Sequence, residues 1–179
     1  VDHYEDEIGT YLMQISGGQI SREDSQTVAM LLHSIGDFER ISDHAMNLCE
    51  VARQMQKKEG KFSKKAVEEL KIYTDAVREI IAMSYQAFEE EDLKKAEMVE
   101  PLEEVIDHID KEEKKRHMKR LRKEKCTIEL GFCLSDIAMN LERIADHCSN
   151  IAVYMIQINE DVLDTHEYLD QVKQEDNED

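Results

Sequence analysis

Pairs of carboxylates at a four-residue spacing are the side chains of this sequence best suited to chemistry. In three places an apolar residue is followed directly by a glutamate and then by an aspartate four residues after that glutamate. The pairs are Glu39 and Asp43, Glu103 and Asp107, and Glu142 and Asp146. Asp2 resembles the surviving half of a fourth pair. Residues four apart lie about one turn apart on one face of a helix, so each pair can share a cation.

Repetition of these pairs favours metal binding over an acidic surface that binds no ion. Like charges four residues apart on a helix destabilise it by a few tenths of a kcal/mol, so three such pairs in register call for a compensating cation. An all-oxygen site suits ferric iron, manganese, magnesium or calcium better than thiol-seeking metals, and zinc is an alternative. A solvated acidic face is the competing interpretation.

A nine-residue motif, E-R-I-x-D-H-x-x-N, occurs twice at a shift of 103 residues, over 39–47 and 142–150. A shift of 105 residues likewise places residues 1–4 over 106–109. Two segment pairs at nearly one offset indicate an internal repeat. We therefore divide the chain into repeat 1 (1–91) and repeat 2 (92–179).

Helical geometry separates the functional groups of the motif. At about 100° per residue, each Glu-Asp pair lies on the flank of the apolar stripe, whereas the histidine that follows the aspartate lies on another side. We therefore expect His44 and His147 to form a hydrogen bond with a neighbouring helix or with one of the acids rather than to bind the metal ion. Asn47 and Asn150 are expected to form hydrogen bonds between helices.

Long amphipathic helices must position these residues. One proline and six glycines leave little material for turns, and apolar residues recur at helical spacing. Helices are predicted over about 4–15, 21–58, 63–88 and 127–159, with starts at Ser21, Ser63 and Thr127. A further helix is predicted over 92–122, bent at Pro101, and a loosely attached tail follows residue 159. The sequence therefore predicts an all-α protein.

The charge of the chain limits its partners. A formal net charge of −18 argues against nucleic acid as a partner. The basic segment 111–125 departs from this acidity, and it is either a solvated helix face or a contact for an anionic membrane surface or an acidic partner. The four cysteines are predicted to be buried, reduced thiols. The chain begins at Val1 rather than Met, so we expect a piece of a longer protein.

The duplicated motif on long helices resembles the PhoU family. The resemblance covers about residues 1–159 and implies a bundle of long antiparallel helices built from two tandem three-helix repeats, with the first helix of repeat 1 and the last helix of repeat 2 truncated. The phrase at 99–107 and the ending at 166–169 further resemble the C-terminal PhoU-like domain of bacterial sodium/phosphate cotransporters.

This resemblance implies a regulator of phosphate transport that carries a multinuclear metal centre, iron first and zinc as the alternative. It assigns metal ligation to Glu39, Asp43, Glu103, Asp107, Glu142 and Asp146, and Asp2 faces the first pair. Repeat 1 lacks an acid at the position matching Glu103, so its site is expected to be the less complete one. The implied partner is a phosphate transporter membrane domain in the same polypeptide, on the cytoplasmic face of the plasma membrane, and a homodimer is left open.

Two other classes of protein compete with this interpretation. Di-iron enzymes are also carboxylate-rich helical bundles, but they need Glu-x-x-His motifs that point inward. Here Ser42 and Ala145 stand where those histidines would be. We therefore predict that the chain is not an enzyme. The third alternative is a metal-free interaction bundle whose basic segment binds an acidic partner.

Overall fold

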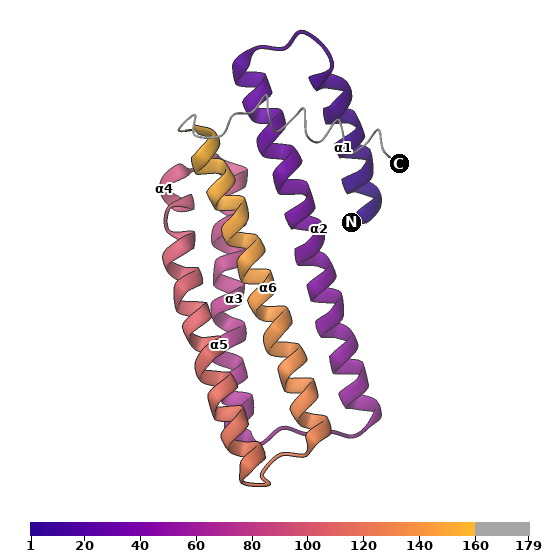
Figure 1. The fold of residues 1–179 in the computed structure, drawn as a ribbon, viewed down its shortest axis with the longest axis vertical. Coiled ribbons are helices and arrows are strands. Elements are labelled where there is room, and N and C mark those ends of the chain that lie inside the picture. The colour runs from indigo at the N-terminus through magenta and orange to yellow at the C-terminus, as the bar shows by residue number, and fades with distance from the viewer. Residues whose placement is uncertain (160–179) are drawn as a thin grey trace.

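The computed structural model describes residues 1–159, which form a bundle of helices and no strand (Figure 1). The predicted all-α fold is confirmed. Its helices are α1 (Asp2–Ser16), α2 (Arg22–Lys57), α3 (Lys64–Glu90), α4 (Leu93–Ala96), α5 (Val99–Arg122) and α6 (Ile128–Asn159). The predicted tail after residue 159 lies outside the described residues.

Side-chain caps mark the starts of α2 and α3. The hydroxyl of Ser21 accepts a hydrogen bond from the backbone N–H of Asp24 at 3.0 Å, and α2 follows. The hydroxyl of Ser63 accepts from the N–H of Ala66 at 3.2 Å and starts α3. Each bond satisfies one of the N–H groups that a first helical turn leaves without a partner. The starts predicted at Ser21 and Ser63 are confirmed.

The single bent helix predicted over 92–122 is wrong. Asp92 caps only the one-turn helix α4, through the N–H of Lys95 at 3.2 Å, and α5 starts separately at Val99. Pro101 therefore lies in the first turn of α5. A residue in the first turn has no helical acceptor for its N–H, so this proline removes no hydrogen bond and does not bend the axis.

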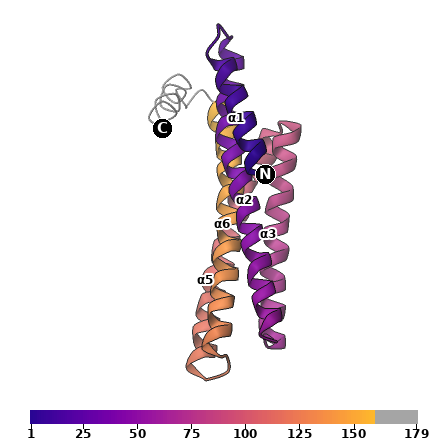
Figure 2. The same cartoon turned by 90° about the vertical axis from the view of Figure 1, so that its right-hand side faces the viewer.

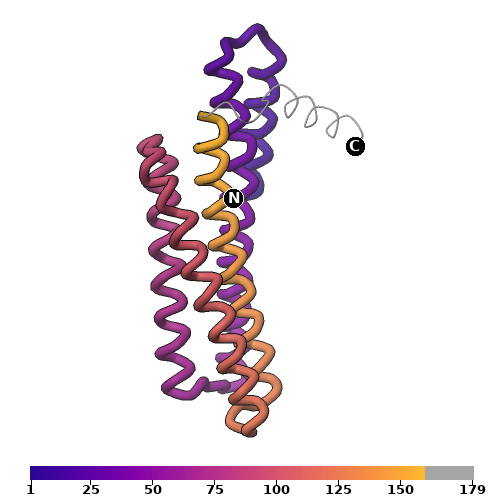
Figure 3. The backbone as a smooth tube through the Cα atoms, turned by 60° about the vertical axis from the view of Figure 1, so that its left-hand side comes forward, coloured from indigo at the N-terminus to yellow at the C-terminus, as the bar shows by residue number. Residues whose placement is uncertain are grey.

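Helix α6 lies at the centre of the arrangement. It packs against α2 on one side and against α3 and α5 on the other, while α1 packs on α2 (Figures 1 and 2). The main core lies around α6, where Tyr73, Ile80, Ile106 and Ile151 are fully buried. The last helix of repeat 1, α3, thus packs on the two long helices of repeat 2, α5 and α6 (Figure 3).

No helix among residues 1–159 combines the length and the apolar character that crossing a membrane requires.

Candidate metal centre

The acids of repeat 1 converge where α1 begins beside the middle of α2. One carboxylate oxygen from each of Asp2, Glu39 and Asp43 lies within 4.8 Å of the other two. Asp2 and Asp43 are exposed and Glu39 is half-buried. The cluster lies between the two helices at the flank of the bundle, where the helical spacing predicts it.

The electrostatics of this cluster favour a bound cation. Partial burial raises the pKa of Glu39, and so do the charge and hydrogen bond of Asp43 and the charge of Asp2, while Arg40 opposes these effects. None of the three carboxylates forms a salt bridge with a residue in the described range. Arg40 offsets their mutual repulsion only in part, and a bound cation can remove the remainder.

The acids of repeat 2 gather between α5 and α6. Glu103, Asp107, Glu142 and Asp146 are all half-buried. Partial burial raises the pKa of Glu103, followed by the negative charges of Asp146, Glu100 and Asp107. Glu103 and Asp146 thus repel each other across the interface between the two helices.

Basic side chains partly neutralise this second set. The ammonium of Lys111 lies 2.5 Å from a carboxylate oxygen of Asp107, and the guanidinium of Arg143 lies 3.3 Å from Asp146. In the described part of the chain, only the first set brings three carboxylates within reach of one ion. The set that the sequence predicts to be less complete is therefore the tighter one.

The histidines and asparagines of the motif form a separate network between α2 and α6. His147 Nδ1 lies 2.6 Å from Asp37 Oδ1, to which the Asn150 amide also donates at 3.3 Å. His44 Nδ1 lies 2.8 Å from Asn140 Oδ1, and Asn47 donates to the same oxygen at 3.2 Å. These bonds pair the two helices in antiparallel orientation and confirm the structural role predicted for the histidines and asparagines.

This network obeys the internal repeat. The shift of 103 residues that superposes His44 on His147 also carries Asp37 onto Asn140. His44 and His147 therefore contact equivalent residues, each on the opposite helix. The two imidazole rings stack with centroids 5.6 Å apart. Sequence reasoning missed Asp37 and Asn140, although both stand at equivalent positions just before the motif.

The two networks have different chemistry. His44 and His147 are engaged at the interface of α2 and α6, so the converging ligands of the first set are carboxylates only. Such a set suits a hard cation. The inward Glu-x-x-His arrangement of a di-iron enzyme is not formed by the motif residues.

A protein-family model and a curated protein both match the sequence of this chain. A model of the PhoU domain family matches residues 1–52 and 70–155. A curated relative, the phosphate-specific transport system accessory protein PhoU homolog 1 of Thermotoga maritima, is 28% identical over 131 residues, which cover 73% of this chain and 56% of that protein. This chain thus spans little more than half of the relative's length.

A solved structure has a similar fold. The crystal structure of PhoU from Pseudomonas aeruginosa superposes with a TM-score of 0.74, over 89% of this chain and 79% of that chain. The two sequences are 21% identical, so this likeness supports the arrangement of helices alone.

Proposed function

Because this chain belongs to the PhoU family, we propose that it is a regulatory module of phosphate transport that binds metal ions through its Glu-Asp pairs. The observation that supports metal binding most directly is the convergence of Asp2, Glu39 and Asp43 from two helices within 4.8 Å, without a basic partner. A bound cation would neutralise these acids and link α1 to α2. Ferric iron is the proposed metal and zinc the alternative.

The second set extends this proposal to more than one ion. Glu103 and Asp107 on α5 oppose Glu142 and Asp146 on α6, and the two salt bridges there involve exposed, flexible basic side chains. Lys111 and Arg143 can swing into solvent when a cation takes their place. The four acids of these two helices carry more negative charge than one ferric ion neutralises, which favours a multinuclear centre.

Elemental analysis of the purified protein tests metal binding. We expect Glu39→Gln/Asp43→Asn and Glu142→Gln/Asp146→Asn each to lower the metal-to-protein ratio. A matched control is Asp75→Asn/Glu79→Gln, which removes two exposed carboxylates at the same spacing from α3. The control should retain the metal content of the unmodified protein. Equal metal content in all four proteins would remove the proposal.

The proposed regulated partner is a phosphate transporter. The name of the Thermotoga maritima relative describes an accessory protein of a phosphate-specific transport system. The resemblance of residues 99–107 to cotransporter PhoU-like domains supports the finer proposal that the module is attached to a sodium/phosphate cotransporter, on the cytoplasmic face of the plasma membrane. The equally similar segment 166–169 lies outside the described residues.

Uptake of labelled phosphate by cells tests this regulatory role. The host is deprived of the protein and then complemented with the natural full-length form or with its Glu39→Gln/Asp43→Asn variant. We expect uptake to respond to external phosphate with the former and to lose that response with the latter. An unchanged uptake response in cells that lack the protein would contradict a regulatory role. If those cells lose the response but cells with the variant keep it, regulation does not depend on the metal.

We propose no catalytic activity for the module. The motif histidines are held by Asp37 and Asn140 at a helix interface, away from the acids that an oxidase would need them to join. An oxygen-consumption assay on iron-loaded protein checks this assignment. Sustained turnover would favour the di-iron enzyme.

A further inference from the structure

The basic segment 111–125 consists of two parts with different surroundings. Its first half is a set of paired lysines: Lys111 with Asp107, Lys114 with Asp110 at 2.6 Å, and Lys115 with Glu112 at 2.7 Å. Their partners lie on the same helix, α5. This half is the ion-paired helix face that a charge run commonly forms.

The second half lines a pocket between the last turns of α5 and the first turns of α3. The pocket has a volume of about 390 Å³. Six cations and one carboxylate line it: Lys65, Arg116, Lys119, Arg120, Lys123, Lys125 and Glu69. It lies at the end of the bundle where α3 starts and α5 ends (Figure 1).

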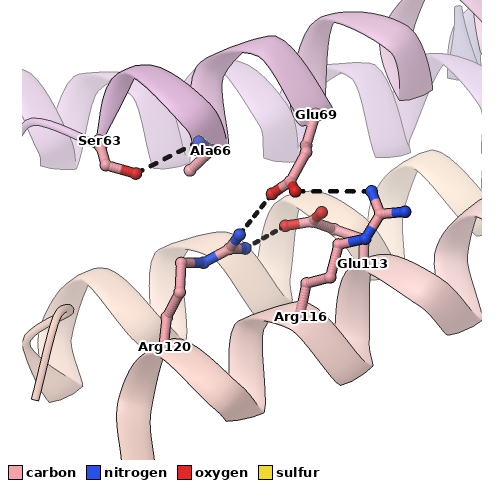
Figure 4. Close-up of polar contacts among 6 residues, drawn as sticks. All are labelled: Ser63, Ala66, Glu69, Glu113, Arg116 and Arg120. Carbon is pink, nitrogen blue, oxygen red and sulfur yellow. Dashed lines mark hydrogen bonds and ion pairs between the residues drawn. The ribbon is translucent and has the colours of Figure 1, made fainter. Parts of the chain in front are cut away.

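The floor of this pocket is fixed by ion pairs between the two helices (Figure 4). Arg120 is largely buried and bridges Glu69 on α3 and Glu113 on α5, and Arg116 lies 3.5 Å from Glu69. These ion pairs compensate the negative charges of Glu69 and Glu113. The arginines thus hold α3 and α5 together beside the pocket.

The lysines of the pocket are left without acidic partners. Lys65, Lys119, Lys123 and Lys125 are exposed, and none of them forms a salt bridge with a residue in the range 1–159. Four ammonium groups therefore surround one cavity in a protein of net charge −18. The electrostatic potential in the pocket is therefore positive, which attracts anions.

Stabilisation of the helix dipole explains only part of this arrangement. Basic residues in the last turn of α5 complement the partial negative charge of that helix end. Lys65, in contrast, stands in the first turn of α3, where the dipole is positive and a lysine is unfavourable. An anion between the two helix ends would complement both Lys65 and the first turn of α3.

We propose that this pocket binds a phosphate group of at least two negative charges, carried either by a soluble pyrophosphate-type anion or by the phosphomonoester headgroup of an anionic lipid. Ammonium groups bind phosphate oxygens as point charges, and four of them suit a multiply charged group better than a singly charged one. The site is distinct from the acidic clusters and requires no bound metal.

Two probes distinguish the sources of this chemistry. Pyrophosphate binding is measured by calorimetry, and lipid binding by co-flotation with phosphatidylcholine vesicles that contain phosphatidic acid. The pocket variant is Lys119→Gln/Lys123→Gln. The matched control is Lys57→Gln/Lys58→Gln, which removes the same charge from exposed lysines at the end of α2, outside the pocket.

We expect the unmodified protein and the control to bind at least one probe, more weakly as salt is added, and the pocket variant to bind it at least about tenfold more weakly. Binding of pyrophosphate alone identifies a soluble ligand, and binding of vesicles alone identifies a lipid. Failure of the unmodified protein to bind either probe overturns the proposal. Undiminished binding by the pocket variant, or an equal loss in both variants, also overturns it.

Discussion

The buried carboxylate of Asp37 depends on His147 and Asn150 for its hydrogen bonds. In His147→Ala, Asp37 keeps only the Asn150 donor, and we expect the free energy of unfolding to fall by about 2–3 kcal/mol. The equivalent change His44→Ala affects the neutral oxygen of Asn140, which Asn47 still contacts, and should cost about 1 kcal/mol. Urea denaturation measures both values. Equal losses in the two variants would show that the charge of Asp37 does not make the contact of His147 more stabilising than that of His44.

The four cysteines are all free thiols, but they are not all buried as the sequence predicts. Cys49 is exposed, whereas burial and then the charge of Asp37 raise the pKa of Cys148 to about 12. Because the thiolate is the reactive form, we expect a disulfide reagent to modify Cys49 rapidly in the native protein and Cys148 only after unfolding. Mass spectrometry of the labelled peptides measures this. Comparable native rates at the two sites would contradict the burial of Cys148.

Spacing alone identifies Glu39 and Asp43 as a pair, because residues four apart share a helix face whatever the tertiary structure. It does not reveal which acids have basic neighbours. The pairing of Arg143 with Asp146 is local, but the tighter convergence at Asp2 depends on where α1 meets α2. Asp37 was missed since a lone acid on a helix gives no sign of its burial.

At the scale of elements, the ion pairs of Arg120 connect α3 to α5. Arg120→Met removes the cation but leaves Glu69 and Glu113 buried, and we expect a loss of about 3–5 kcal/mol at neutral pH. Chemical denaturation of the variant and the unmodified protein measures the loss. A change below about 1 kcal/mol would mean that the network contributes no more than a surface ion pair.

The same variant should depend on pH in a defined direction. Burial already raises the pKa of Glu113 while Arg120 opposes the shift, so removal of Arg120 raises that pKa further. A carboxyl group with a raised folded-state pKa favours folding at low pH and loses this contribution as pH rises through the folded-state value. The deficit of Arg120→Met should therefore shrink as pH is lowered from neutral toward the carboxyl range. A deficit independent of pH would contradict this account.

Helix starts were predictable where a side chain caps the first turn, as at Ser21 and Ser63. The break between α4 and α5 was not. Ala96 and Val99 flank the break, lie three residues apart and are both fully buried, so the apolar spacing continues across it. Hydrophobic periodicity reports burial and cannot show that the hydrogen-bonded ladder is interrupted.

At the scale of the whole molecule, a metal ion should stabilise the fold. The ligands of the first set come from α1 and α2, so an ion that binds the folded chain raises its free energy of unfolding by mass action, by about 2.7 kcal/mol at a concentration one hundred times Kd. Thermal unfolding with and without added iron measures this. Glu39→Gln/Asp43→Asn should show a smaller increase, whereas an increase equal to that of the unmodified protein would indicate binding elsewhere.

Duplication was visible in the sequence, but its three-dimensional consequence was not. The 103-residue shift identifies equivalent helices without showing that α2 and α6 pack on each other or that α3 packs mainly on α5 and α6. These choices depend on the fit of whole helix surfaces. The contacts of Asp37 with His147 and of Asn140 with His44 follow the symmetry of the internal repeat across the interface of α2 and α6.

The central claim is that carboxylates of the repeated motif bind metal ions. Anomalous diffraction from crystals of the iron-loaded protein tests it most directly. We expect an anomalous peak about 2.0–2.2 Å from carboxylate oxygens of Asp2, Glu39 and Asp43. A map with no peak at either acidic set, or with iron bound only at histidine or cysteine side chains, would contradict the claim.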